Sequence, residues 1–248
     1  MARPTLREWL QDAPFSLALS AGFFGFYAHA GFVAALEEAN VANPQRVLGA
    51  SAGALVAGLW ASGMDAAALE RELTALRREH FWDPGFGFGL LRGELFRERL
   101  EALAPGATFE GARVPAALSV FDLLRRRTEI ADSGPLAPAI HGSCALPGLF
   151  QPTRVGGRWV VDGGVLDRPA HAALRRGERV LYHHLTGKSP WRTEAPRVPA
   201  RDAMVAVVIE GLPRLGPTRL AEGPRAFDRA RRAARAALER PAGDVIDA

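Results

Sequence analysis

The stretch RVLGASAGALVAGLWASG, residues 46–63, joins a short apolar run to a longer one through small residues on both sides of Ser51. The run 46–50 predicts a buried strand and 52–63 predicts a helix, because their lengths and apolar patterns are typical of these elements. Residues 49–53, GASAG, fit the G-x-S-x-G pattern of a nucleophile elbow, in which a serine occupies a tight turn between a strand and a helix. The pattern alone is equally compatible with a close-packed turn that carries a structural serine.

The preceding part of the chain has the same order of elements. FSLALSAG, residues 15–22, predicts another short buried strand, and YAHAGFVAALEEANV, residues 27–41, predicts a helix that ends near Asn40. The first 63 residues therefore alternate strand, helix, strand, helix. This order predicts an α/β fold with a central, mostly parallel sheet flanked by helices.

Further elements are expected along the remainder of the chain. Helices are predicted over 65–82, 94–104, 136–146 and 223–241, and strands over 114–124, 127–132, 158–164 and 178–185. Between the first two of these helices, WDPGFGFGLLRG (82–93) is rich in Gly and Phe. It predicts a mobile flap with exposed aromatic side chains that covers an apolar site, or alternatively an ordinary loop whose Phe side chains fold back into the core.

Composition limits the classes of function. Lys and Arg number 31 against 27 Asp and Glu, a formal charge of +4, and Lys188 is the only lysine. No basic cluster interleaved with aromatics is present, so nucleic-acid binding is not expected. Cys144 is the only cysteine, which excludes an intrachain disulfide. Neither a secretory pattern nor an apolar run long enough for a spanning helix is found, and we expect a cytoplasmic protein that contacts membranes at most peripherally.

A second turn of small residues could complete a catalytic site. SAGFFGFY, residues 20–27, lies between a predicted strand and helix, so its backbone N–H groups would face the same sheet edge as Ser51 and stabilise an oxyanion. The N–H of Ala52 would add a donor. A dinucleotide site would instead need an acidic residue at the end of the second strand, whereas Glu37 and Glu38 fall within the predicted helix.

The candidate base is an aspartate. Asp162 ends the predicted strand WVVD and precedes Gly163 and Gly164, which allow a close approach, so its carboxylate could take the Ser51 proton. A turn-capping role is the alternative, because Asp-Gly pairs are common in turns. None of the histidines occupies a convincing triad position, and two adjacent ones on a strand would point to opposite faces. The six are His29, His80, His141, His171, His183 and His184.

From Ser16 to Leu185 the chain resembles a patatin-like phospholipase domain. The resemblance is carried by LSAGFFGFYAHAGFVAALEE (19–38), by GASAG (49–53), and by DSGPLAPAIHGSCALPGLFQPTRVGGRWVVDGG (132–164) with its closing DGG. It implies a patatin-like three-layer fold and a Ser–Asp dyad without histidine that acts on acyl esters of lipids. The implied site residues are the nucleophile Ser51, the base Asp162, the oxyanion loop Gly22, Phe23, Phe24 and Gly25, and the motif glycines Gly49, Gly53, Gly163 and Gly164.

The resemblance also divides the chain and limits its partners. It implies an N-terminal extension (1–15), an acyl hydrolase domain (16–185), and a C-terminal loop and helix (186–248) packed on that domain. A lipid or acyl ester is the implied partner, with no metal or organic cofactor.

Two positions depart from the family's glycine-rich loop, which usually reads G-x-G-x-x-G. Ser20 replaces the first glycine, so either this position tolerates negative φ or the loop is distorted. Phe24 stands where a basic residue is common, and one extra residue precedes Gly31. Two alternatives stay open. One is a carrier-protein transacylase, which shares the G-x-S-x-G pattern but has a Ser–His arrangement, and the other is a homologue that binds lipid or membrane and has lost activity through these loop departures.

Overall fold

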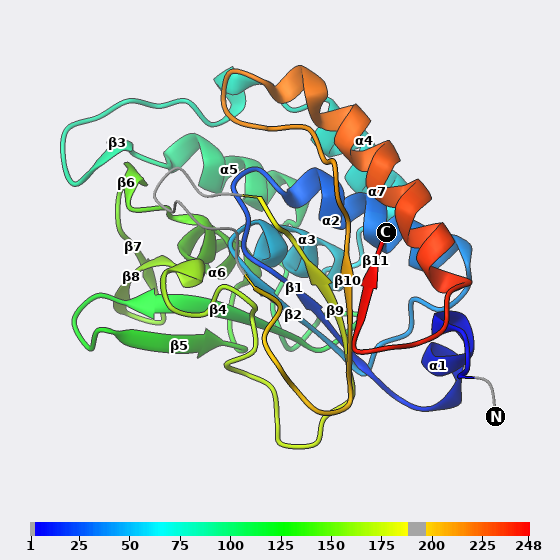
Figure 1. Ribbon diagram of the computed structural model, residues 1–248. Coiled ribbons are helices and arrows are strands. Elements are labelled where there is room, and N and C mark those ends of the chain that lie inside the picture. Colours follow the sequence, from blue (N-terminus) through cyan, green and yellow to red (C-terminus); the bar gives the residue numbers. More distant parts are fainter. Residues whose placement is uncertain (1–2, 188–196) are drawn as a thin grey trace.

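A computed structural model describes residues 3–187 and 197–248 of the chain (Figure 1). Its main sheet has the strand order β11-β10-β9-β1-β2-β4-β8-β7, with β5 also paired to β4. Neighbours from β11 to β4 are parallel, whereas β5, β7 and β8 pair in antiparallel fashion. The strands are β1 (Ser16–Leu19), β2 (Arg46–Ala50), β4 (Ala116–Asp122), β5 (Arg127–Ala131), β7 (Thr153–Val155), β8 (Arg158–Asp162), β9 (Val180–His184), β10 (Met204–Val208) and β11 (Val245–Asp247). The predicted mostly parallel α/β fold is confirmed.

The α-helices pack mainly on one face of this sheet, and a second, two-stranded sheet lies beside it. The α-helices are α1 (Leu6–Asp12), α2 (Phe26–Glu38), α3 (Ala52–Ala61), α4 (Ala66–Thr74), α5 (Glu94–Leu103), α6 (Leu136–Cys144) and α7 (Gly223–Leu238). Short 3₁₀ turns are η1 (Arg78–His80), η2 (Gly163–Val165) and η3 (Leu220–Glu222). The small sheet pairs β3 (Gly89–Leu91) with β6 (Gly148–Phe150) in parallel.

The two faces of the central strands are covered differently. Side chains alternate along a strand, so Leu17 and Leu19 of β1 join the large core formed with α2, α3 and α7, while Ala18 faces the other way. On that second face Ala18 packs with Leu48 and Tyr182 under the irregular segment 166–179. Helices, sheet and irregular segment make three layers, and α7 lies along α2 on the helical side (Figure 1).

Several element boundaries differ from the sequence prediction. The helix predicted over 65–82 ends at Thr74, because the chain then turns and buries Phe81 in a separate apolar cluster with Leu91 and Phe150. Tertiary packing here outweighs helical propensity. Strands β10 and β11, which extend the main sheet, were not predicted. Residues 1–2 of the predicted extension and 188–196 of the predicted C-terminal loop lie outside the described residues.

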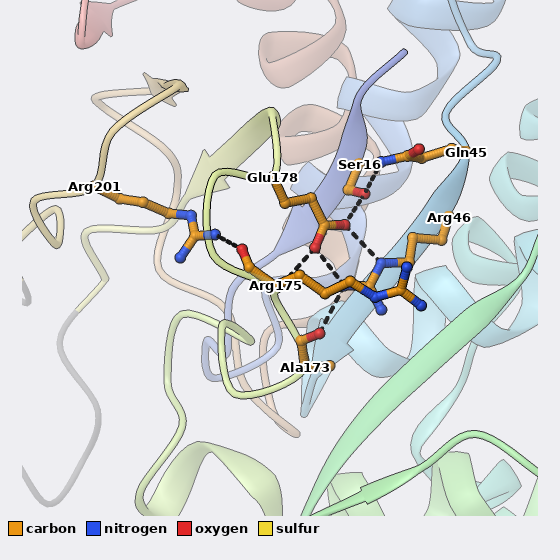
Figure 2. A network of polar contacts seen from close by, with 7 residues as sticks. All are labelled: Ser16, Gln45, Arg46, Ala173, Arg175, Glu178 and Arg201. Atoms are coloured by element: carbon orange, nitrogen blue, oxygen red, sulfur yellow. Dashed lines mark hydrogen bonds and ion pairs between the residues drawn. The ribbon is translucent and has the colours of Figure 1, made fainter.

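A buried ion pair joins the amino ends of the central strands (Figure 2). The Arg46 guanidinium donates to both carboxylate oxygens of Glu178, at 2.7 and 2.5 Å, and to the Ala173 carbonyl at 2.6 Å. The Ser16 hydroxyl and the Arg175 N–H also donate to Glu178. Burial raises the pKa of Glu178, but the hydrogen bonds from Arg46, Ser16 and Arg175 outweigh it and lower the pKa to about 2. The network fixes β1, β2 and the turn before β9 relative to one another.

Glu178→Gln is expected to destabilise the fold by about 3–5 kcal/mol, because it leaves a mostly buried guanidinium without its counter-charge. In the native protein the carboxylate's contribution should be complete above its ordinary pKa of 4.5 and be lost as the pH falls toward about 2. Chemical denaturation at several pH values measures both effects. The control is Glu239→Gln at the exposed pair with Arg7, where little change is expected. Equal denaturant concentrations at the unfolding midpoints of the two variants would contradict a stabilising role of this network.

Candidate active site

Ser51 occupies the turn between β2 and α3 in a strained conformation. Its φ is 53° and its ψ is −120°, in a region that L-residues rarely adopt. The flanking glycines are required sterically: a Cβ on Gly53 would lie 2.1 Å from the Leu19 carbonyl oxygen, and one on Gly49 would lie 2.5 Å from that of Gly53. The turn therefore packs α3 directly against β1 and β2 and presents the Ser51 hydroxyl at the amino end of α3.

Asp162, the last residue of β8, lies beside this hydroxyl. The Ser51 hydroxyl donates to Asp162 Oδ2 at 2.6 Å, and the Gly164 N–H donates to Oδ1 at 2.7 Å. Asp162 is 3% exposed, and its burial raises the carboxyl pKa from 3.8 to about 6, against the lowering effect of the Ser51 and Gly164 hydrogen bonds. The carboxyl group can therefore change protonation state near neutral pH while it remains in contact with Ser51.

The two glycines after Asp162 allow three segments to meet. A Cβ on Gly163 would lie 1.9 Å from the Ser119 carbonyl oxygen of β4, so this position must be glycine for η2 to reach the sheet. A Cβ on Gly164 would lie 2.6 Å from the Ala21 side chain. Gly164 thus lies between the loop after β1 and the Ser51 turn. The close approaches at Gly163 and Gly164 place the DGG turn at the centre of the site.

Two further residues, missed in the sequence analysis, hold the Ser51 backbone in place. The Ser51 N–H donates to Ser143 Oγ at 2.9 Å, and Ser143 in turn donates to the Ser119 carbonyl at 2.7 Å. Cys144 Sγ donates to the Ser51 carbonyl at 3.1 Å. Ser143 and Cys144 end α6, more than ninety residues after Ser51, and the sequence offered no local signal for this contact.

The loop expected to supply oxyanion donors lines the cavity into which Ser51 projects. Gly22, Phe23, Phe24 and Ala52 line the same cavity as Ser51 and Asp162. Gly25 has a different position, because its N–H donates to the Gly22 carbonyl at 3.1 Å and so closes the turn. Added Cβ atoms at Gly22 and Gly25 would lie 2.6 and 2.2 Å from Leu185 Cδ1, so a side chain at either position would displace the end of the Leu185 side chain.

The two departures from the family's loop have structural explanations. Ser20 is not among the residues with positive φ, so this position accommodates a side chain. Its hydroxyl accepts a hydrogen bond from the Leu185 N–H at 3.0 Å, and its carbonyl lies 2.8 Å from His29 Nε2. Phe24 has a φ of 54°, which L-residues adopt at a cost of roughly 1–2 kcal/mol. Its ring lies against Phe26 and Phe81 and adds to the apolar wall of the cavity.

The Ser51 hydroxyl is hydrogen-bonded to Asp162, and the histidines make their contacts elsewhere. His29 and His183 contact each other through their Nδ1 atoms at 2.9 Å, between α2 and β9. The prediction that His183 and His184 face opposite ways is confirmed, because His184 Nδ1 lies 2.8 Å from the Tyr182 hydroxyl on the other face. His141 packs edge-on against Phe96 and Phe150. Of the six histidines, only His80 lines the cavity, from η1, and the hydrogen-bond partner of the Ser51 hydroxyl is Asp162.

An apolar cavity of about 610 Å³ extends from the Ser51 hydroxyl, within the usual size range of small-molecule sites. Its wall is built mainly from aromatic and aliphatic side chains of α3, α4, α5 and β6. They include Leu55, Leu59, Leu73, Leu76, Phe81, Phe96, Leu100, Leu103, Leu149 and Phe150. Among residues 3–187 and 197–248, no group of three or more His, Cys, Asp and Glu side chains is arranged to hold a metal ion.

Two solved structures show the same fold. VipD from Legionella pneumophila aligns with a TM-score of 0.62 at 18% identity, over 91% of this chain and 66% of VipD. The type III effector protein ExoU aligns with a TM-score of 0.50 at 17% identity, over 96% of this chain and 53% of ExoU. At these identities the likeness concerns the fold alone.

Sequence comparison identifies the family. Uncharacterized NTE family proteins of Mycobacterium bovis and Mycobacterium tuberculosis are 32% identical to this chain over 205 residues, which is 81% of this chain and 55% of each relative. The chain thus spans about half the length of these curated relatives. The family model for the patatin-like phospholipase matches residues 17–174, which contain the Ser51 turn, the loop after β1 and the DGG turn. This chain therefore belongs to the patatin-like phospholipase family.

Proposed function

We propose that the protein is a serine acyl hydrolase that cleaves fatty acyl esters of lipids with a Ser51–Asp162 dyad. The observation that carries this proposal is the 2.6 Å hydrogen bond from the Ser51 hydroxyl to Asp162 at a strained strand-to-helix turn. Family membership supports a lipid ester as the substrate. The apolar cavity beside Ser51 supports a long acyl chain as the part of the substrate that is bound.

In the proposed reaction Asp162 accepts the Ser51 proton while Oγ attacks the acyl carbonyl carbon. Backbone N–H groups of the loop from Gly22 to Phe24 and of Ala52 stabilise the negative charge that develops on the carbonyl oxygen. Asp162 then returns the proton to the departing alcohol, which leaves an acyl ester on Ser51. A water molecule, deprotonated by Asp162, attacks this ester and releases the fatty acid, with Ser51 taking the proton back from Asp162.

The geometry favours this dyad over the Ser–His arrangement of a carrier-protein transacylase. The Ser51 hydroxyl donates to an aspartate, and His29, His183 and His184 have partners in the sheet and α2. Two assays of the purified protein test the proposal: fluorophosphonate labelling, and hydrolysis of acyl esters of graded chain length. We expect labelling at Ser51 and faster hydrolysis of longer chains. If the protein shows neither fluorophosphonate labelling nor ester hydrolysis, it is an impaired homologue that only binds lipid.

The pH dependence of hydrolysis should report the protonation state of Asp162. A general base must be ionised, and burial raises the pKa of Asp162 to about 6. We therefore expect kcat/KM for a soluble short-chain ester to reach its plateau above about pH 6 and to decrease about tenfold per pH unit well below it. A profile that stays flat down to pH 4.5 in folded protein would argue against Asp162 as the base.

A further inference from the structure

An exposed apolar hairpin lies beside the cavity. Residues 84–91, PGFGFGLL, contain no charged or polar side chain. Phe86 and Phe88 are 108% and 90% exposed and Leu90 is half exposed, whereas Leu91 is fully buried. The exposed side chains alternate with glycines, so they lie on the outer face of this hairpin. Figure 1 shows the segment before β3 as an outlying loop on the side of the molecule away from α1.

Several backbone polar groups of this hairpin have partners within the protein. Gln151 Oε1 accepts from the Phe88 N–H at 2.9 Å, and its Nε2 donates to the carbonyls of Phe86 and Gly89, at 3.2 and 2.8 Å. The Gly85 N–H donates to the Leu90 carbonyl at 3.0 Å. An apolar medium offers no hydrogen-bond partners, so a segment that enters it must satisfy its own backbone. The hairpin meets this requirement at these positions while keeping its aromatic side chains outside the core.

The hairpin adjoins the wall of the cavity through its pairing with β6. β3 pairs with β6, and Leu149 and Phe150 of β6 line the cavity that starts at Ser51. Gln151, which holds the hairpin, follows them directly. A surface on which Phe86 and Phe88 rested would therefore lie beside the part of the cavity wall that Leu149 and Phe150 form.

We propose that Phe86, Phe88 and Leu90 insert into the acyl-chain layer of a lipid surface and anchor the protein there with its cavity facing the lipid. This inference rests on the proposed function, since a fatty acyl lipid is presented at such a surface. A protein partner is the less suitable occupant, because protein interfaces combine apolar contacts with hydrogen bonds. Here the outward-facing side chains offer none, and the backbone groups named above are already bonded internally.

The test measures binding to phosphatidylcholine vesicles by sedimentation, with Ser51→Ala protein so that binding is independent of turnover. Burial of one large apolar side chain changes partitioning by about tenfold or more. We therefore expect Phe86→Ser/Phe88→Ser to lower the vesicle partition coefficient at least tenfold without a change in Tm. The matched control is Leu123→Ser/Leu124→Ser in the turn between β4 and β5, where Leu124 is 81% exposed; its binding should stay unchanged.

Three results would overturn the anchor. They are absence of vesicle binding by the parent protein, equal binding by the Phe86/Phe88 variant, and a concentration-dependent dimer that this variant abolishes. The proposed function is tested separately by hydrolysis of a soluble short-chain ester with Ser51 in place, which the Phe86/Phe88 variant should retain. Vesicle binding without ester hydrolysis would contradict the proposed function but not the proposed lipid anchor.

Discussion

Ser51→Ala should reduce ester hydrolysis to background, a loss of roughly 10⁶-fold if Ser51 is the nucleophile. The substitution removes a single hydroxyl whose hydrogen bond goes to Asp162, while the backbone contacts of Ser51 to Ser143 and Cys144 are preserved. Folding should therefore be nearly unaffected. Steady-state assays on a soluble ester, fluorophosphonate labelling and thermal denaturation of the same preparation measure these effects together.

Ser62→Ala is the matched control. Ser62 lies at the other end of α3, where its hydroxyl donates to the Leu59 carbonyl at 2.7 Å, outside the cavity. We expect this variant to keep its activity and its labelling. Hydrolysis that persists in pure Ser51→Ala protein would exclude the dyad and transfer the nucleophilic role to another residue.

Asp162→Asn should lower kcat by roughly 10²–10⁴-fold, the usual contribution of a general base. Asparagine keeps the shape of the side chain and can still accept the Gly164 N–H, but it cannot take the Ser51 proton. The decrease of activity below about pH 6 should disappear in the residual activity of this variant, because the titrating group has been removed. A pH series of kcat/KM compared with that of the unaltered protein measures both effects.

Two sets of variants control for nonspecific damage. Asp122→Asn changes another buried aspartate, at the end of β4, whose carboxylate accepts the backbone N–H groups of Leu124 and Arg125. Its activity should be close to normal. Single His→Ala substitutions that still fold should likewise retain the chemical step. If any one of them lost as much activity as Ser51→Ala, a Ser–His mechanism would replace the dyad.

Elements whose signals are local can be predicted from the amino-acid sequence. The apolar run 46–50, the small residues around Ser51 and the helix after them specify a strand, a tight turn and a helix from neighbouring residues alone, and so predict the elbow. The same is true of the DGG turn after β8. Together with the resemblance, these local patterns predicted the family and the α/β fold, both of which are confirmed. The place of Asp162 at a strand end before two glycines predicts a candidate base, but it does not predict which side chains surround the carboxylate.

The way in which these elements meet depends on contacts between distant parts of the chain. The contacts of Ser143 and Cys144 with Ser51, and of Leu185 with Gly22 and Gly25, join segments far apart in the sequence, where no local periodicity constrains the partners. The raised pKa of Asp162 arises from burial, which depends on everything packed around it. The segment around the predicted flap gives another example. Phe81 is buried, whereas Phe86 and Phe88 are exposed. All three positions are phenylalanine. Their exposure differs because the Phe81 side chain packs with Leu91 and Phe150, whereas Phe86 and Phe88 lie on the outer face of the hairpin.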